Sequence, residues 1–124
     1  MDGVFKIGDV EVGKGVLIAP MAGVTDLPFR RTASKLGASY TVSEMVACET
    51  LALGRPDMVR RAAVGDGLPP ERIPEKCEAV FRSEHAPMVI QLAGSEPEWI
   101  AKGAEIAEAA GADIIDINMG CPTR

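Results

Sequence analysis

The chain has 124 residues, which is enough for one domain and too few for two. Hydrophobic residues make up 47% and charged residues 25%, as in a soluble globular protein rather than a disordered one. Aromatic residues are only 4%, while there are 13 glycines and 9 prolines, so the composition favours an α/β chain with many turns over an all-β sandwich.

The net charge of -5 has the wrong sign for a chain that binds phosphates by itself. If the protein contacts nucleic acid, most of the basic surface must therefore come from elsewhere. The basic pairs at 30–31 and 60–61, together with Arg55, are interpreted as solvated helix faces.

The sequence lacks the signals of several other classes of protein. No apolar run approaches the ~18 residues that span a bilayer, and no secretory signal is visible at the start. Three cysteines without a C-x-x-C pair and a single histidine (His85) argue against a disulfide framework and a metal site, and favour a cytoplasmic location. Without a G-x-G-x-x-G or Walker A segment, we do not expect a classical nicotinamide-binding sheet.

The first strand–helix unit follows a small hairpin. Alternation around a Gly-Asp pair predicts this β-hairpin over 5–12, and the apolar run 16–19 predicts a strand buried on both faces. The next helix is predicted to have Thr25 or Asp26 as its N-cap and to end at Gly37. Helical spacing assigns its inward stripe to Phe29, Thr32, Ala33 and Leu36.

The second unit combines a strand with a broken helix. Residues 39–46 are predicted as the strand, and a helical region over about 48–63 is interrupted near 54–56 by Gly and Pro. The interval before the third strand is about twice the others, and it holds an extra segment at about 68–86. We interpret this segment as an inserted helical excursion in which no chemistry is visible.

The last two strands are predicted at 88–92 and 113–118. The helix between them opens with a capping-box pattern at Ser95 and Glu98 and ends at Gly111. Its stripe of mostly small residues suits close packing on a sheet: Ile100, Gly103, Ala104 and Ala107. About four β/α units with short junctions imply an α/β fold with a parallel sheet, and periodicity alone does not distinguish an open sheet from a barrel.

Polar and sulfur-bearing residues gather where the predicted strands end. In parallel α/β folds, ligands bind at the carboxyl ends of the strands. Gln91 and Asn118 need hydrogen-bond partners there, which either neighbouring loops or a ligand would supply. Glu44 suits a helix cap better than a hydrogen-bond acceptor for a ligand, and Met21 and Met45 suit contact with a flat ligand and packing in the core or a loop equally well. Together these strand ends favour a binding site at one edge of the sheet.

Cys121 is the candidate for acid–base chemistry. Gly120 and Pro122 hold it in a rigid loop at a strand end. A free thiol has a pKa of about 8.5, so at neutral pH it is mostly protonated and serves as a general acid without tuning. The single histidine offers no evident base partner, so nucleophilic Cys–His chemistry is not favoured. Cys48 and Cys77 are interpreted as small buried hydrophobic residues.

Four segments resemble tRNA-dihydrouridine synthases, and the bacterial DusB-like branch in particular. They are A-P-M-A-G-V-T-D at 19–26, S-E-M at 43–45, V-I-Q-L-A-G at 89–94 and D-I-N-M-G-C-P at 116–122. Members of that family have an FMN-binding TIM barrel followed by a helical domain. They reduce a uridine of tRNA to 5,6-dihydrouridine with NADPH, through the flavin. The resemblance therefore implies FMN and NADPH as cofactors and tRNA as partner.

The resemblance also assigns roles to single residues. Pro20, Met21 and Ala22 match the loop that lies against the FMN ring, and Gln91 matches the residue that hydrogen-bonds the ring. Asn118 matches a substrate residue near the flavin and the target base. In the implied mechanism the flavin delivers hydride to C6 of uracil and Cys121, the matching proton donor, protonates C5.

The resemblance implies that residues 1–124 are the first half of such a barrel, with the hairpin in front and the insertion at about 68–86. The insertion is longer than the passage expected in this branch. Because a TIM barrel needs eight strands and about 250 residues, we expect the flavin-phosphate site to be missing and FMN binding by this chain to be weak or absent. We also expect the unpaired first and fourth strands to make the chain self-associate.

Two alternatives stay open at this point. One is another FMN barrel acting on a free pyrimidine, such as a dihydroorotate or dihydropyrimidine dehydrogenase. The segment A-P-M-A-G-V-T-D argues against it. The other is a half barrel that folds or self-associates without activity. A reduction assay on tRNA and on free pyrimidine separates the two enzymes, and flavin absorbance of the purified chain bears on the third interpretation.

Overall fold

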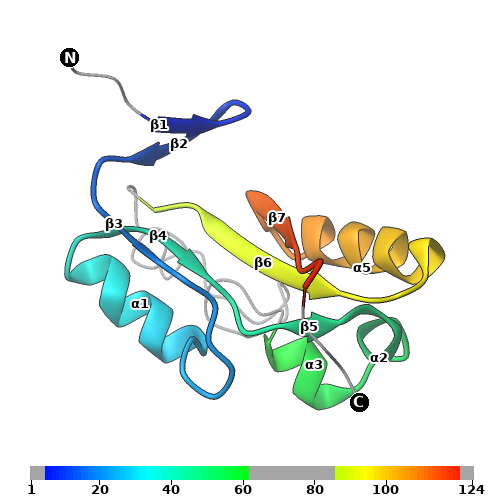
Figure 1. Cartoon of the computed structure of the whole chain (residues 1–124). Coiled ribbons are helices and arrows are strands. Elements are labelled where there is room, and N and C mark those ends of the chain that lie inside the picture. The colour runs from blue at the N-terminus through cyan, green and yellow to red at the C-terminus, as the bar shows by residue number, and fades with distance from the viewer. Residues whose placement is uncertain (1–4, 62–85, 121–124) are drawn as a thin grey trace.

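The computed structural model describes residues 5–61 and 86–120. It opens with an antiparallel hairpin of β1 (Phe5–Ile7) and β2 (Val10–Gly13), as the sequence predicts. Gly8 turns it with a φ of 57°, in the region that glycine adopts without strain. The hairpin lies where β3 begins, at the end of the sheet opposite to the candidate site (Figure 1).

The remaining strands form one parallel sheet. They are β3 (Val16–Ile18), β4 (Ala38–Val42), β5 (Val46–Ala47), β6 (Met88–Ala93) and β7 (Ile114–Ile117). β4 and β5 pair with successive parts of one edge of β6, β7 pairs with the other edge, and β3 lies outside β4. The strands therefore follow one another across the sheet in chain order. An α/β fold with a parallel sheet is confirmed, and closure into a barrel stays a prediction.

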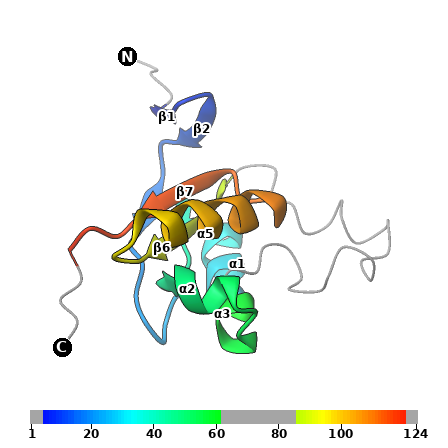
Figure 2. The same ribbon diagram turned by 90° about the vertical axis from the view of Figure 1, so that its right-hand side faces the viewer.

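Four helices connect the strands in the part of the chain that the structure describes. They are α1 (Leu27–Lys35), α2 (Cys48–Ala52), α3 (Pro56–Arg61) and α5 (Pro97–Ala109), which Figure 2 shows from the side. Asp26 is the N-cap of α1, one of the two caps predicted, because its carboxylate accepts the Phe29 N–H at 2.9 Å and satisfies a donor that the helix leaves unpaired. Gly37, with a φ of 101°, ends the turn after the helix.

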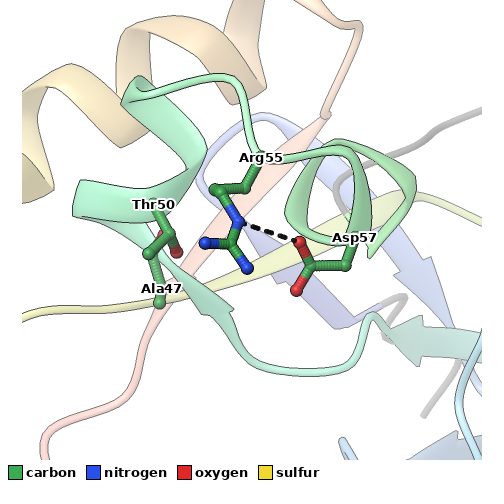
Figure 3. A network of polar contacts seen from close by, with 4 residues as sticks. All are labelled: Ala47, Thr50, Arg55 and Asp57. Atoms are coloured by element: carbon green, nitrogen blue, oxygen red, sulfur yellow. Dashed lines mark hydrogen bonds and ion pairs between the residues drawn. The ribbon is translucent and has the colours of Figure 1, made fainter.

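The predicted break between α2 and α3 is confirmed. The Arg55 N–H donates to the Thr50 carbonyl at 3.0 Å, and the Thr50 hydroxyl donates to the Ala47 carbonyl at 3.0 Å. Figure 3 shows this corner, where the Arg55 guanidinium also meets Asp57 at 3.7 Å. Because both charged side chains are exposed, the ion pair contributes little stability. The corner is held mainly by the hydrogen bond from the Arg55 N–H to the Thr50 carbonyl.

The main hydrophobic core lies between the sheet and the helices α2 and α5. Its buried side chains are Val46, Cys48, Leu51, Ile90, Leu92 and Ala107. Gly103 is buried against Cys48, and a Cβ at position 103 would lie 2.7 Å from the Cys48 sulfur. The absence of a side chain at Gly103 therefore lets α5 approach α2, and the predicted inward stripe of α5 is confirmed.

Two burial predictions near the start of the chain are wrong. β3 is not buried on both faces, since Val16 is 65% exposed and Leu17 is 55% exposed. The inward stripe of α1 fails because Thr32 and Leu36 are exposed, the latter by 83%. β3 pairs only with β4 among the described strands, so no described strand pairs with its other edge.

Two local predictions also need correction. The strand at 39–46 is interrupted after Val42 and becomes β4 and β5, and at the interruption the Ser43 hydroxyl accepts the Gln91 N–H of β6. The capping box at Ser95 and Glu98 does not form: Glu96 is the N-cap of α5, and no side chain caps this helix. Proline at the first position of α5 has no N–H to satisfy, which makes a side-chain cap less necessary.

Most of the predicted insertion at 68–86 lies outside the described residues. None of the helices in 5–61 and 86–120 is long and apolar enough to cross a membrane. Within the same residues, no cluster of three or more His, Cys, Asp or Glu side chains offers a metal site.

Candidate functional site

A polar group of side chains lies on the face of the sheet that points away from α2 and α5. Ile90 and Ile115 pair across β6 and β7 and both pack in the helix-side core. Because successive strand residues point to opposite faces, their neighbours Gln91 and Asp116 point to the other side. These two residues are also in register, so their side chains lie directly beside one another.

Three hydrogen bonds connect this group in a row. Nε2 of Gln91 donates to Oδ2 of Asp116 at 2.6 Å. Nδ2 of Asn118 donates to Oε1 of Gln91 at 3.3 Å, and the Gly120 N–H donates to Oδ1 of Asn118 at 3.0 Å. The backbone N–H of Asn118 donates to the Leu92 carbonyl and holds the residue beside the end of β6. The predicted pair of Gln91 and Asn118 is therefore brought together.

The interruption between β4 and β5 supports the same group. The buried Ser43 hydroxyl accepts the Gln91 N–H at 2.9 Å and donates to the Glu44 carbonyl at 2.8 Å. The Ser43 hydroxyl thus takes the place of a backbone carbonyl as the acceptor of the Gln91 N–H. Two residues on, the Met45 sulfur lies 3.7 Å from Nδ2 of Asn118. Met45 packs against the polar group rather than in the core.

The loop after β3 is fixed by hydrogen bonds to its own backbone and to Glu44. The Thr25 hydroxyl accepts the Met21 N–H at 3.1 Å, and the Thr25 N–H donates back to the Met21 carbonyl at 3.0 Å. Oε1 of Glu44 accepts the Gly23 N–H at 2.7 Å. Glu44 therefore braces this loop, and the expectation that it caps a helix is wrong, since Ala47 is the N-cap of α2.

Arg30 contradicts its interpretation as part of a solvated helix face. It is only 2% exposed, and Nε donates to the Thr25 carbonyl at 3.2 Å. Burial lowers the pKa of Arg30 from its ordinary value, and the charges of Asp26 and Glu44 oppose this change. The guanidinium is a donor only, and its hydrogen bond to the Thr25 carbonyl ties the loop after β3 to α1.

The ring-side residues of the sequence prediction lie on this loop. Met21 is 41% exposed, Ala22 is exposed and Pro20 is half-buried. Hydrogen bonds through Glu44 and Ser43 link this loop to Gln91. Cys121 lies outside the described residues, directly after Gly120.

Three residues that hold the site together were not assigned a role from the sequence: Ser43, Asp116 and Arg30. Asp116 carries the clearest signal, since it is an acidic residue inside the apolar strand Ile-Ile-Asp-Ile. Partial burial, and then the charge of Asp116, raise the pKa of Tyr40 above its ordinary value of 10.0. The Tyr40 phenol is therefore neutral at physiological pH, and the charge of Asp116 contributes to its raised pKa.

The chemistry available here is hydrogen bonding to a flat polar ligand. A carboxamide has two donor hydrogens and two acceptor lone pairs, and the hydrogen bonds of Gln91 use one of each. The remaining N–H and lone pair suit a ring edge on which carbonyl and N–H groups alternate, as in a flavin or a pyrimidine. Gln91 is nearly buried, so such a ring would be bound with little competition from water.

Comparison with known proteins identifies a family model and several relatives that are similar to the chain. The model of the family described as "Dihydrouridine synthase (Dus)" matches residues 17–124. A probable tRNA-dihydrouridine synthase of Rickettsia conorii is 37% identical over 119 residues, which are 96% of this chain and 31% of the relative. tRNA-dihydrouridine synthase B of Vibrio cholerae is 39% identical over 119 residues, with 96% and 32% covered.

A third relative, a probable tRNA-dihydrouridine synthase of Rhizobium leguminosarum, is 42% identical over 115 residues, covering 93% of this chain and 31% of the relative. No solved structure matches the chain significantly. The chain spans about a third of the length of these curated relatives. Because the family model covers all but the first 16 residues, the chain belongs to the dihydrouridine synthase family.

Proposed function

We propose that the chain is the amino-terminal part of a cytoplasmic enzyme that reduces uridine in tRNA to 5,6-dihydrouridine, with FMN and NADPH. One observation carries this proposal. Gln91 and Asn118, which the resemblance assigns to the flavin and the target base, are hydrogen-bonded to each other at the carboxyl end of the sheet. The proposal includes closure of residues 1–124, with their insertion, into the first half of a TIM barrel.

The described residues fit a flavin ring. Gln91 offers one N–H and one lone pair to the pyrimidine edge of the ring. On the loop with Pro20 and Ala22, the half-exposed Met21 provides a polarizable thioether for the flat ring face. In this proposal Gln91 orients the ring and the loop covers one of its sides.

The described residues fit the flavin phosphate poorly. Helix N-termini bind phosphates through their free N–H groups and positive dipole ends. At this edge the N-terminus of α1 is capped by the Asp26 carboxylate, and α5 begins between Glu96 and Glu98. These negative charges repel an anion, so in this proposal neither of these two helix ends holds the phosphate.

In the proposed reaction, the chemistry that bound FMN supplies is delivery of a hydride to C6 of uracil, after reduction by NADPH. Asn118 lies beside Gln91, and it would position the uracil near the ring. The Cys121 thiol would donate a proton to C5, so that hydride and proton together saturate the C5=C6 bond. The base must leave its stack to reach this site.

The test uses the complete protein with an unmodified tRNA transcript. Nucleoside mass spectrometry after incubation with FMN and NADPH is expected to show dihydrouridine, and omission of NADPH is expected to abolish it. Parallel reactions contain uracil or orotate in place of tRNA. Reduction of a free pyrimidine with tRNA left unchanged would establish the dehydrogenase alternative, and a folded protein inactive on all substrates would establish the non-catalytic one.

A further inference from the structure

The row of hydrogen bonds from Gly120 to Asp116 has two ends that cannot exchange roles. A backbone N–H only donates, and an ionised carboxylate only accepts. Gly120 is the donor at one end, and Asp116 is the acceptor at the other. The carboxamides of Asn118 and Gln91 lie between them, and each has one end that donates and one that accepts.

The two fixed ends determine how both carboxamides are turned. If Gln91 were rotated by 180°, its oxygen would face the Asp116 carboxylate at 2.6 Å, and two acceptors would repel each other. Asn118 would then face the Gln91 nitrogen with its own nitrogen unless it rotated as well. That second rotation would turn its nitrogen toward the Gly120 N–H, which requires an acceptor. A single arrangement satisfies every bond in the row.

We propose that Asp116 is a positioning residue that sets the direction of this row and thereby fixes which donor and acceptor of Gln91 remain for a ring with an imide edge. The orientation of the carboxamides follows from the structure alone. The identity of the ring as flavin rests on the proposed function.

The charge of Asp116 has a second, independent reporter. Tyr40 is the single tyrosine of the chain, so ultraviolet titration of tyrosinate measures its ionisation alone. The charge of Asp116 contributes to the raised pKa of Tyr40. Replacing Asp116 with asparagine or leucine removes this charge, so both variants should lower the Tyr40 pKa towards its ordinary value, with burial still holding it above that value.

Asp113 provides a matched control on the same strand segment. Its Oδ2 accepts the Met88 N–H at 2.8 Å, so it also links the β7 segment to β6, but at the opposite end of the strands. Asp113→Leu therefore removes a comparable strand-to-strand bond without touching Gln91, Asn118 or Tyr40.

The primary experiment is nitrogen-15 NMR of the side-chain NH₂ groups in the 124-residue chain. Asp116→Leu should speed exchange of the Gln91 NH₂ protons with water about tenfold or more, because a hydrogen bond to a charged acceptor is lost. Asp116→Asn should largely preserve the slow exchange, because an amide oxygen still accepts. Asp113→Leu should leave the Gln91 and Asn118 signals unchanged.

Two results would overturn the proposal. The first is slow Gln91 exchange in Asp116→Leu equal to that of the unchanged chain. The second, which needs no variant and therefore holds even where Asp116→Leu does not fold, comes from couplings across hydrogen bonds. A coupling from Nε2 of Gln91 to the Asp116 carboxyl carbon supports the assigned direction, and evidence that Nε2 faces Asn118 contradicts it.

The consequence for the ring is measured in the complete protein as FMN affinity by fluorescence quenching. Asp116→Leu should weaken FMN binding about tenfold, while Asp116→Asn and Asp113→Leu stay close to the unchanged protein. If the NMR results hold but the unchanged protein binds no FMN, the proposed function fails and the positioning role stands. If FMN binds and the exchange of the Gln91 NH₂ protons is unchanged in Asp116→Leu, the positioning role fails and the function stands.

Discussion

Gly103 of α5 shows how one residue sets the distance between two helices. Glycine inside a helix costs about 1 kcal/mol relative to alanine, so its presence needs a compensating contact. That contact is Cys48: a Cβ at position 103 would lie 2.7 Å from its sulfur and 3.1 Å from its Cβ. No neighbour can give way easily, because Cys48 is itself fully buried in the core.

Gly103→Ala should therefore destabilise the chain by about 1–3 kcal/mol despite its better helix propensity, because the extra methyl overpacks the core. Urea unfolding followed by circular dichroism measures this change. Cys48→Ala in the same chain removes the atom at 2.7 Å, so the double variant should be more stable than the sum of the single changes predicts. Strict additivity of the two free-energy changes would contradict a direct clash.

The Cys48 thiol and the Tyr40 phenol make stability depend on alkaline pH. Burial raises the pKa of Cys48 more than its hydrogen bond to the Ala93 backbone lowers it. Partial burial and Asp116 raise the pKa of Tyr40. Above the ordinary values of 9.0 and 10.0, the unfolded chain loses these protons before the folded chain does. The stability they contribute is thus complete below the unfolded pKa values and is lost as pH rises.

We expect the free energy of unfolding to fall above about pH 9, with about 1.4 kcal/mol per pH unit as the upper limit of the slope for each group. Urea midpoints measured from pH 7 to 11 give this profile. Tyr40→Phe should remove the part of the fall that begins near pH 10. A profile in Tyr40→Phe identical to that of the unchanged chain would show that Tyr40 carries no such linkage.

Gln91 and Asn118 could be identified from the sequence because a carboxamide at the end of an apolar strand needs partners. Asp116 and Arg30 could not be identified in the same way. A charged residue is usually solvated, and its burial depends on the neighbours with which it forms hydrogen bonds. For Arg30 that neighbour is the Thr25 carbonyl, and for Asp116 it is a residue 25 positions away in the chain.

The shape of the loop after β3 depends on the carboxylate of Glu44, which belongs to the next strand–helix unit. Oε1 of Glu44 accepts the exposed Gly23 N–H, and the Glu44 charge also favours the charged form of the buried Arg30. Glu44→Ala should therefore increase hydrogen exchange at the Gly23 amide by about three- to tenfold, as expected for loss of one hydrogen bond. Amide exchange by NMR gives the measurement.

Glu44→Gln is the matched variant, because its amide oxygen can accept the same N–H while the charge is lost. It should retain most of the protection at Gly23. Glu108→Ala, at an exposed position on α5, should leave Gly23 unaffected. Equal protection in Glu44→Ala and the unchanged chain would mean that the loop holds its shape through the Met21–Thr25 bonds alone.

Element types were more predictable than element ends and burial. Periodicity predicted the hairpin, the parallel strands, and both α1 and α5, because these patterns are local. The interruption at Ser43 is not local, since the Ser43 hydroxyl takes the N–H of Gln91, 48 residues later. The exposure of Val16 and Leu36 likewise depends on what packs against them, which no spacing encodes.

The described sheet has two open edges, one at β3 and one at β7. β3 and β7 each pair on one side only among the described strands, with Leu17 exposed on one edge and Ile117 exposed on the other. Open edges recruit further strands. We expect the chain to form dimers or larger species, measured by sedimentation velocity over a range of concentrations.

A charge on the edge should weaken this association. Leu17→Lys should shift the population towards the monomer, because edge lysines disfavour strand addition. Leu53→Lys, which changes an exposed leucine at the end of α2, should not do so. A monomer mass that is independent of concentration would contradict the expectation.

The most direct test of the proposed function is the replacement of Cys121 in the complete protein. A general acid typically contributes about 10²–10⁴-fold, so Cys121→Ala should lower the rate of uridine reduction in tRNA by about that factor. FMN content and reduction of the flavin by NADPH should stay nearly unchanged, and Cys77→Ala should at most alter stability. Full turnover in Cys121→Ala would contradict the assignment of the proton to this loop, and with it the catalytic role proposed for the edge at Gln91 and Asn118.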